Sequence, residues 1–208
     1  KIEQQVEKNG LPVVCVQGLG FVGAAMAIVV ASATDKAGKP RFNVIGVDLP
    51  TPDGMEKIEA VNQGLFPFPT VDKKLTEAAG KVNRQGNLIA TSLVESFKFA
   101  ETTLVNVHLD VSYDQDERPY LNLSSFRKAI GTLGTHMKVG SLVIIETTVP
   151  PGTCEKVAAP ELASALSARE LAEDSILLAH SYERVMPGEH YFDSIVNFWR
   201  VFSGHTPQ

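Results

Sequence analysis

Short apolar runs rich in β-branched residues alternate with amphipathic stretches along this chain. Each run has the length of a strand, and the stretches between the runs carry apolar residues at helical spacing. Strands that are apolar on both faces are typical of a parallel sheet that helices cover on both sides. The pattern predicts strands at residues 12–17, 42–48, 87–91, 103–110, 141–147 and 175–181.

The stretches between these runs predict the crossover helices. Connections between parallel strands are right-handed, so the alternation predicts an α/β fold, a doubly wound parallel Rossmann sheet with six strands in the order 3-2-1-4-5-6. The segment at 64–72, GLFPFPTVD, is too rich in Pro and Gly for regular structure and is predicted to be a functional loop. The predicted helices are residues 22–33, 54–61, 71–79, 123–137 and 153–166.

A further helix is predicted from Tyr191 to Gly204, where aromatic and aliphatic residues recur at helical spacing. Such a face usually packs in the core or against another subunit. The residues on this predicted face are Phe192, Ile195, Phe198, Trp199 and Phe202.

A glycine cluster follows the first predicted strand and opens the first predicted helix. Gly18, Gly20 and Gly23 form G-x-G-x-x-G, which permits a tight turn, a close approach of a pyrophosphate to the backbone, and close helix–strand packing. The amides at the helix start then face the phosphates at the positive end of the helix dipole. The predicted cofactor-binding residues of this turn are Gly18, Leu19, Gly20, Phe21, Val22 and Gly23.

Asp48 ends the second predicted strand and completes the pattern. A carboxylate there accepts hydrogen bonds from both hydroxyls of a ribose and repels a 2′-phosphate, which predicts NAD rather than NADP. The alternative is a purely structural strand-to-helix turn, with Asp48 capping the helix near Asp53.

Composition and missing motifs exclude several other classes of protein. A net charge of -5 without a basic run argues against nucleic acid. No apolar run reaches the length of a membrane span, and no signal-peptide core is present. Two cysteines allow no disulfide framework, so the expected location is a reducing cytoplasm. Two cysteines and scattered histidines predict no metal site. No P-loop, Tyr-x-x-x-Lys pair or nucleophile elbow occurs.

Three further segments occur in a distinctive order. They are DLPTPDGMEKIEAVNQGLFPF (48–68), ETTVPPGTCEKV (146–157) and SYERVMPG (181–188). Together with GLGFVG, they resemble the N-terminal NAD-binding domain of the UDP-glucose/GDP-mannose dehydrogenase family. The resemblance implies oxidation of the C6 alcohol of a nucleotide-linked sugar to a carboxylate, with two NAD reduced. It also implies a homodimer or higher oligomer in the full-length protein.

The same resemblance implies roles for two residues. Thr148 stands at the threonine of the family's S-T-V segment and is expected to contact the cofactor and to position a water or the reacting sugar; the alternative is a cap of the turn before Pro150. Glu183 stands at the glutamate of P-E-F-L and is expected to orient water or to take a proton. The alternative for Glu183 is a surface residue paired with Arg184.

Departures from the family pattern narrow the expected substrate. Pro187 replaces the second glutamate, and ERVMPG is similar to the branches that act on UDP-N-acetylhexosamines, so a UDP-sugar of that kind is expected, with UDP-glucose as the alternative. After the fourth strand His108-Leu109 replaces the family's Thr-Pro, which puts the cofactor contact at that point in doubt.

The family's catalytic cysteine motif does not occur in this chain. Cys154 lies near a helix start that would lower its pKa, but a structural thiol is the stronger interpretation. We therefore expect a Rossmann domain at residues 1–190, the start of a connection to an absent second domain at 191–208, and no turnover by this chain alone. The alternatives are a non-catalytic Rossmann nucleotide-binding module and, with less support in the motifs, a relative of 6-phosphogluconate or hydroxyacid dehydrogenases.

Overall fold

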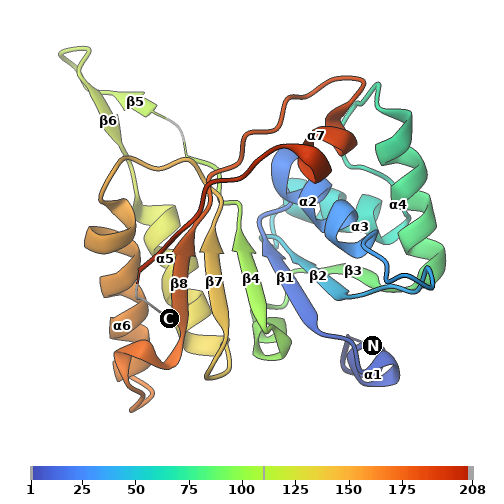
Figure 1. The fold of residues 1–208 in the computed structure, drawn as a ribbon. Helices are drawn as coiled ribbons and strands as arrows, with labels where there is room; N and C mark the ends of the chain where they lie inside the picture. The colour runs from blue at the N-terminus through green and yellow to red at the C-terminus, as the bar shows by residue number, and fades with distance from the viewer. Residues whose placement is uncertain (1, 110, 206–208) are drawn as a thin grey trace.

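The computed structural model, which describes residues 2–109 and 111–205, contains a seven-stranded sheet of order β3-β2-β1-β4-β7-β8-β9 (Figure 1). The six strands from β3 to β8 are parallel, which confirms the predicted Rossmann order, and the seventh is a short addition at one edge. The parallel strands are β1 (Val13–Gln17), β2 (Asn43–Val47), β3 (Leu88–Thr91), β4 (Thr102–Val105), β7 (Leu142–Ile145) and β8 (Leu177–His180).

Helices cover both faces of the sheet, and each face has its own apolar cluster. Figure 1 shows α2, α3 and α4 on one side and α5 and α6 on the other. No helix in the described residues is long and apolar enough to cross a membrane. The helices of the two faces are α2 (Phe21–Ala31), α3 (Pro52–Asn62), α4 (Lys73–Gln85), α5 (Ser124–His136) and α6 (Ala159–Ser167), and α1 (Ile2–Asn9) packs on the α5 side.

Local capping explains where the helices begin. Thr51 accepts a hydrogen bond from the Gly54 amide at the start of α3, and Pro52 at the first helical position needs no such partner. Asp72 caps α4 in the same way, and Gly86 ends it in the left-handed region at φ 72°. The helices predicted at 54–61 and 71–79 are confirmed in position and are longer than predicted.

The segment between β4 and α5 differs from the prediction. The strand predicted at 103–110 ends at Val105, and Asp110 lies outside the described residues. An antiparallel hairpin follows, with β5 (Val111–Tyr113) paired to β6 (Pro119–Leu121). Its strands have mostly exposed side chains and show no apolar alternation, so periodicity could not reveal them.

The helix predicted through Gly204 is wrong beyond Asn197. Helix α7 (Tyr191–Asn197) ends where Phe198 becomes extended, and β9 (Ser203–Gly204) pairs antiparallel with β8. The consecutive aromatic and β-branched residues here suit an extended chain, and pairing satisfies the backbone of the sheet edge. Ile195 and Phe192 of the predicted face lie on α7 and pack against the core, whereas Trp199 and Phe202 are 90% and 80% exposed, so the face does not continue beyond α7.

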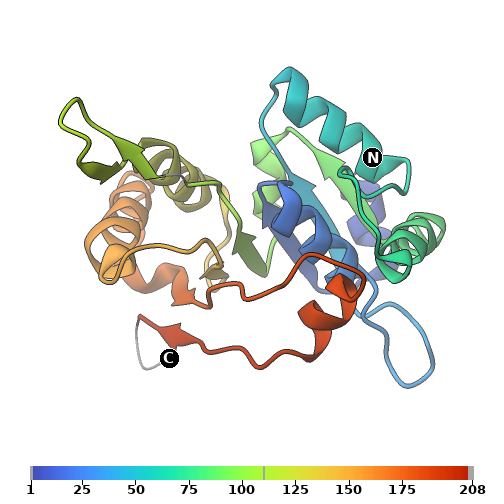
Figure 2. The same ribbon diagram turned by 90° about the horizontal axis from the view of Figure 1, so that it is seen from above.

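We call residues 198–205 the C-terminal strap. Figure 2 shows the chain after β8 running out to α7 and returning to β9 along the same side of the molecule. Helix α7 packs against α2, so the segment between β8 and β9 contacts the helix that follows the glycine turn.

Candidate functional site

The glycine turn between β1 and α2 has a backbone that requires glycine at two positions. Gly18 has φ +89°, and a Cβ there would lie 2.5 Å from the Asn106 carbonyl oxygen. A Cβ on Gly23 would lie 1.9 Å from the Gly18 carbonyl oxygen. Both residues therefore allow β1, α2 and the end of β4 to meet closely.

Gly20 differs from its neighbours because a Cβ there would meet nothing within 4 Å. It is the N-cap of α2, no side chain of the described residues caps this helix, and no acidic residue lies in its first turn. The helix start therefore keeps its unpaired amides and its positive dipole end for an external anion. The space left by Gly20 fits a phosphate group that approaches the backbone closely.

Asp48 lies beside this turn at the carboxyl end of β2. Its Oδ2 accepts a hydrogen bond from the Leu19 amide at 2.8 Å, and its Oδ1 accepts one from the Leu49 amide at 2.7 Å. The cap of α3 is Thr51, so Asp48 does not cap that helix. The structure thus brings the predicted glycines and the predicted acid together, with lone pairs left on both carboxylate oxygens.

An aromatic cluster supports the start of α2. Phe21 stacks on Tyr191 at a centroid distance of 5.0 Å and contacts Phe66 and Phe68 at 5.3 and 5.6 Å. The Tyr191 hydroxyl also donates to the Phe21 carbonyl oxygen at 3.3 Å. Phe66 and Phe68 come from the loop predicted to be functional, and in this structure they hold the glycine turn in place.

A buried charged cluster lies at the ends of β4, β7 and β8. Glu146 is 3% exposed and accepts hydrogen bonds from the Asn106 amide group at 2.9 Å and from Arg200 at 2.7 Å. Arg200 also pairs with Glu183. Burial raises the pKa of Glu146, while the Asn106 hydrogen bond and the Arg200 charge oppose this shift.

Of this cluster, sequence reasoning found only Glu183. Its side chain is 9% exposed, and Arg184 contacts it through the backbone amide, so it is not a surface glutamate paired with the Arg184 side chain. Glu146 lies two residues before the predicted Thr148 in the same segment, and this position could have identified it as a site residue. Nothing in the sequence indicated Arg200, because it lies far along the chain within a pattern that resembled a helix.

Thr148 is exposed near the carboxyl end of β7, and its hydroxyl has no hydrogen bond to any described residue. The turn is held instead by Thr147, which donates to the carbonyl oxygens of Val105 and Val107, and by Thr153, which donates to that of Pro150. No hydrogen bond joins Thr148 to Glu183 within the described chain.

Cys154 lies half-buried in a π-helical turn, η2 (Cys154–Ala158), that precedes α6. Burial raises the pKa of its thiol, whereas the sequence suggested a lowered pKa at a helix start. A thiol with a raised pKa is a poor nucleophile at neutral pH, which supports a structural role for Cys154.

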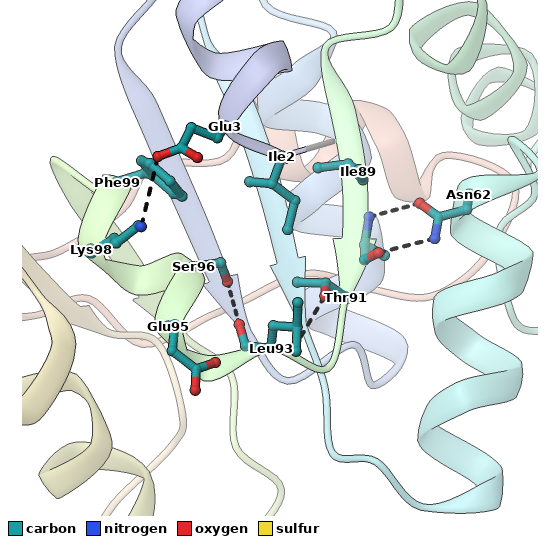
Figure 3. Close-up of a pocket in the computed structure, with 11 residues that line it drawn as sticks. Ile2, Glu3, Asn62, Ile89, Thr91, Leu93, Glu95, Ser96, Lys98 and Phe99 are labelled. Atoms are coloured by element: carbon teal, nitrogen blue, oxygen red, sulfur yellow. Dashed lines mark hydrogen bonds and ion pairs between the residues drawn. The ribbon is translucent and has the colours of Figure 1, made fainter.

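A separate hollow lies between α1, β3 and the short helix η1 (Val94–Phe99), with a volume of about 420 Å³ (Figure 3). On its rim the Asn62 side chain pairs with both the amide and the carbonyl of Ala90, which covers the free edge of β3. None of the predicted site residues lines it. The hollow adjoins the carboxyl edge, since the Thr91 carbonyl oxygen on its wall accepts a hydrogen bond from the Asp48 amide at 3.2 Å.

The fold and the glycine turn with its acid define a dinucleotide-binding domain of the Rossmann type. Residues 13–208 match the UDP-glucose/GDP-mannose dehydrogenase family, NAD binding domain. The chain therefore belongs to this family.

Individual relatives agree with this assignment. The chain is 33% identical over 193 residues to a UDP-N-acetyl-D-mannosamine dehydrogenase of Pyrococcus horikoshii, covering 92% of this chain and 40% of that protein. It is 30% identical over 197 residues to a UDP-N-acetyl-D-glucosamine 6-dehydrogenase of Pseudomonas aeruginosa, covering 94% and 40%. The crystal structure of an NDP-N-acetyl-D-galactosaminuronic acid dehydrogenase from Methanosarcina mazei matches with a TM-score of 0.81 and 27% identity, over 100% of this chain and 42% of that one. The chain thus spans about 40% of the length of these relatives.

Proposed function

We propose that the glycine turn and Asp48 form the NAD site of this chain. The observation that carries the proposal is the open position at Gly20 in front of an uncapped helix start, between two glycines that the backbone requires. The pyrophosphate takes this space and accepts hydrogen bonds from the amides of Phe21 and Val22. Asp48 accepts hydrogen bonds from the adenosine ribose and repels a 2′-phosphate, which favours NAD over NADP.

We further propose that this domain supplies the cofactor-binding part of a nucleotide-sugar 6-dehydrogenase. When bound, NAD supplies the acceptor for the hydride that leaves the sugar C6. Thr148 contacts the cofactor and, with its exposed hydroxyl, positions the sugar or a water molecule. Glu183 orients water or takes a proton during formation of the carboxylate. Their positions at the ends of neighbouring strands support these roles, since ligands of parallel sheets bind at that edge.

The proposed substrate is a UDP-N-acetylhexosamine. The ERVMPG segment around Glu183 supports this choice, as do the names of the relatives from Pyrococcus horikoshii and Pseudomonas aeruginosa. UDP-glucose is the alternative substrate.

We place the activity in the cytoplasm and in polysaccharide biosynthesis. We also propose a homodimer or higher oligomer, which the exposed Trp199 and Phe202 of the strap support. In the proposed division, residues 1–190 are the cofactor domain and 191–208 begin the connection to the rest of the enzyme.

Calorimetric titration with NAD and with NADP tests the proposed site. The wild-type chain is expected to bind NAD saturably and NADP at least about tenfold more weakly, because a 2′-phosphate would face the Asp48 carboxylate. The variant Asp48→Asn should lose about tenfold in NAD affinity and most of this discrimination.

Asp35→Asn is the matched control, because Asp35 also accepts two backbone amides, from Ala37 and Lys39, but in an exposed turn away from the site. It should bind NAD as the wild type does. Failure of a folded wild-type chain to bind NAD, or equal binding of NAD and NADP by the wild type, would overturn the proposed site.

A further inference from the structure

Asn106 connects the glycine turn to the buried charged cluster. Its carbonyl oxygen lies against Gly18, and its Cβ would be 3.1 Å from a Cβ on Gly23. From the same residue the side-chain amide donates to Glu146 at 2.9 Å. One residue therefore separates the Glu146 carboxylate from the turn that is proposed to receive the pyrophosphate.

This placement raises an electrostatic problem for an anionic cofactor. A buried carboxylate interacts strongly with nearby charges because little water screens it. An ionised Glu146 would repel a pyrophosphate at the adjacent turn. Glu183 is a second carboxylate in this cluster, and its charge acts on Glu146 and helps to raise the Glu146 pKa.

Arg200 is placed to solve this problem. One guanidinium nitrogen donates a hydrogen bond to Glu146 at 2.7 Å, and the other donates one to Glu183. The Arg200 side chain is only 26% exposed. Within the described residues no other cationic side chain pairs with either carboxylate. The strap holds Arg200 there through the pairing of β9 with β8.

We propose that Arg200 is a positioning residue that neutralises Glu146, so that the glycine turn accepts an anionic cofactor. This inference rests on the proposed NAD site. It assigns to the strap a function in cofactor binding, exerted through Glu146 and Asn106 rather than by direct contact with NAD.

Removal of Arg200 should make the pH dependence of NAD binding steeper than it is in the wild type. The groups that face Glu146 are Asn106 after β4, Glu183 after β8 and Arg200 of the strap, while Tyr191 of α7 interacts electrostatically with Glu183. Without Arg200, the chain binds NAD well only when Glu146 is protonated, because the protonated carboxyl group does not repel the pyrophosphate. Affinity must therefore fall as pH rises through the Glu146 titration.

The test is calorimetric titration of the wild-type chain and of Arg200→Met with NAD from pH 5 to pH 8.5. We expect the variant to bind within about threefold of the wild type at pH 5 and at least about tenfold more weakly at pH 8.5. The double variant Arg200→Met/Glu146→Gln should recover most of the loss at pH 8.5. If Arg200 acted only on stability, the fraction of folded Arg200→Met chain, measured by circular dichroism at pH 8.5, would account for the whole loss, and the folded chain would bind NAD as the wild type does.

Arg127→Met is the matched control, because Arg127 makes a solvent-exposed pair with Glu161 at 2.6 Å and carries the same charge. It should leave NAD affinity unchanged at every pH. Arg200→Lys keeps the charge and should lose less than about threefold.

Glu146→Gln alone keeps the proposal testable if Arg200→Met does not fold. It leaves Arg200 with one carboxylate partner, Glu183, instead of two, so the net charge beside the glycine turn becomes less negative and NAD affinity should rise about twofold or more at pH 8.5. No change or a decrease in that variant would overturn the inference, as would equal binding by wild type and Arg200→Met at pH 8.5. Absence of NAD binding by the wild type would instead overturn the proposed function on which the inference rests.

Discussion

The two halves of the carboxyl edge are built in different ways. On the β1–β2 side the site consists of backbone: the turn from Gly18 to Gly23, an uncapped helix start, and Asp48 joined to the Leu19 amide. On the β4–β8 side it consists of side chains, with Glu146 and Glu183 held by Arg200 from the C-terminal strap.

The two halves should therefore respond differently to substitutions and to pH. The backbone half depends on the absence of side-chain atoms, so adding a single Cβ disrupts it. The side-chain half depends on balanced buried charge, so it responds to pH and to removal of one partner. The three glycines of the first half lie within residues 18–23, whereas Glu146 and Arg200 of the second half are 54 positions apart.

The largest expected effect is on the backbone half. Gly23→Ala places a Cβ at 1.9 Å from the Gly18 carbonyl oxygen, which is backbone and can move only with β1 or α2. We expect a loss of about 4 kcal/mol or more in the free energy of unfolding. Chemical denaturation measures it, with Gly131→Ala as a control that should stabilise by about 0.5–1 kcal/mol, since a Cβ on this helical residue meets nothing within 4 Å. A Gly23→Ala variant as stable as the wild type would contradict the close packing of the turn.

The side-chain half should respond next most strongly. Arg200→Met leaves Glu146 buried without its cation, so unfolding free energy should fall by about 3 kcal/mol at pH 8 and by less at pH 5, where protonation relieves the charge. Urea unfolding at the two pH values measures this. Arg127→Met, which breaks an exposed pair, should cost less than about 1 kcal/mol. Equal losses at the two pH values would contradict the charge argument.

A smaller effect is expected where α7, which leads the chain into the C-terminal strap, meets α4. Asp72 is 1% exposed and accepts hydrogen bonds from the amides of Leu75 in α4 and Phe192 in α7. One carboxylate therefore caps two helices, and Asp72→Ala should cost about 2 kcal/mol. In the Asp72→Ala variant, the backbone amides of α7 should also exchange their hydrogens faster than those of β1. Unchanged exchange in α7 would mean that this cap does not hold it.

The smallest expected effect is a change in the free energy of unfolding with pH. Because the pKa of Glu146 is raised in the folded chain, the folded state holds its proton more tightly than the unfolded state does. Folding stability from this group is therefore lost as pH rises from the unfolded pKa through the folded one. Relative to the wild type, Glu146→Gln should gain stability steadily over that range in urea titrations. A difference that does not change with pH would show that Glu146 titrates as it does in water.

The sequence predicted the backbone half better than the side-chain half for a physical reason. Gly18, Gly23 and Asp48 satisfy steric and hydrogen-bonding needs that recur wherever a strand turns into a helix over a phosphate, so their spacing is informative. The six parallel strands were predicted because apolar runs mark buried strands.

Other features left no periodic signal. Arg200 pairs with residues 17 and 54 positions away, and no local pattern records such a pairing. The run from Phe198 to Phe202 has apolar residues that fit a helix as well as a strand, and pairing with β8 decides between them. The exposed β5–β6 hairpin lacks the alternation that identifies a half-buried strand.

Gly20→Val tests whether the glycine turn is a preformed anion site. Gly20 has φ −63° and open space at its Cβ position, so the variant should fold, at a cost of about 1 kcal/mol because Val is a poorer N-cap than Gly. Calorimetric titration should show saturable NAD binding by the wild type and by Gly131→Val, and at least about tenfold weaker binding by Gly20→Val, whose side chain fills the phosphate space. A folded Gly20→Val chain that binds NAD as tightly as the wild type would contradict the account.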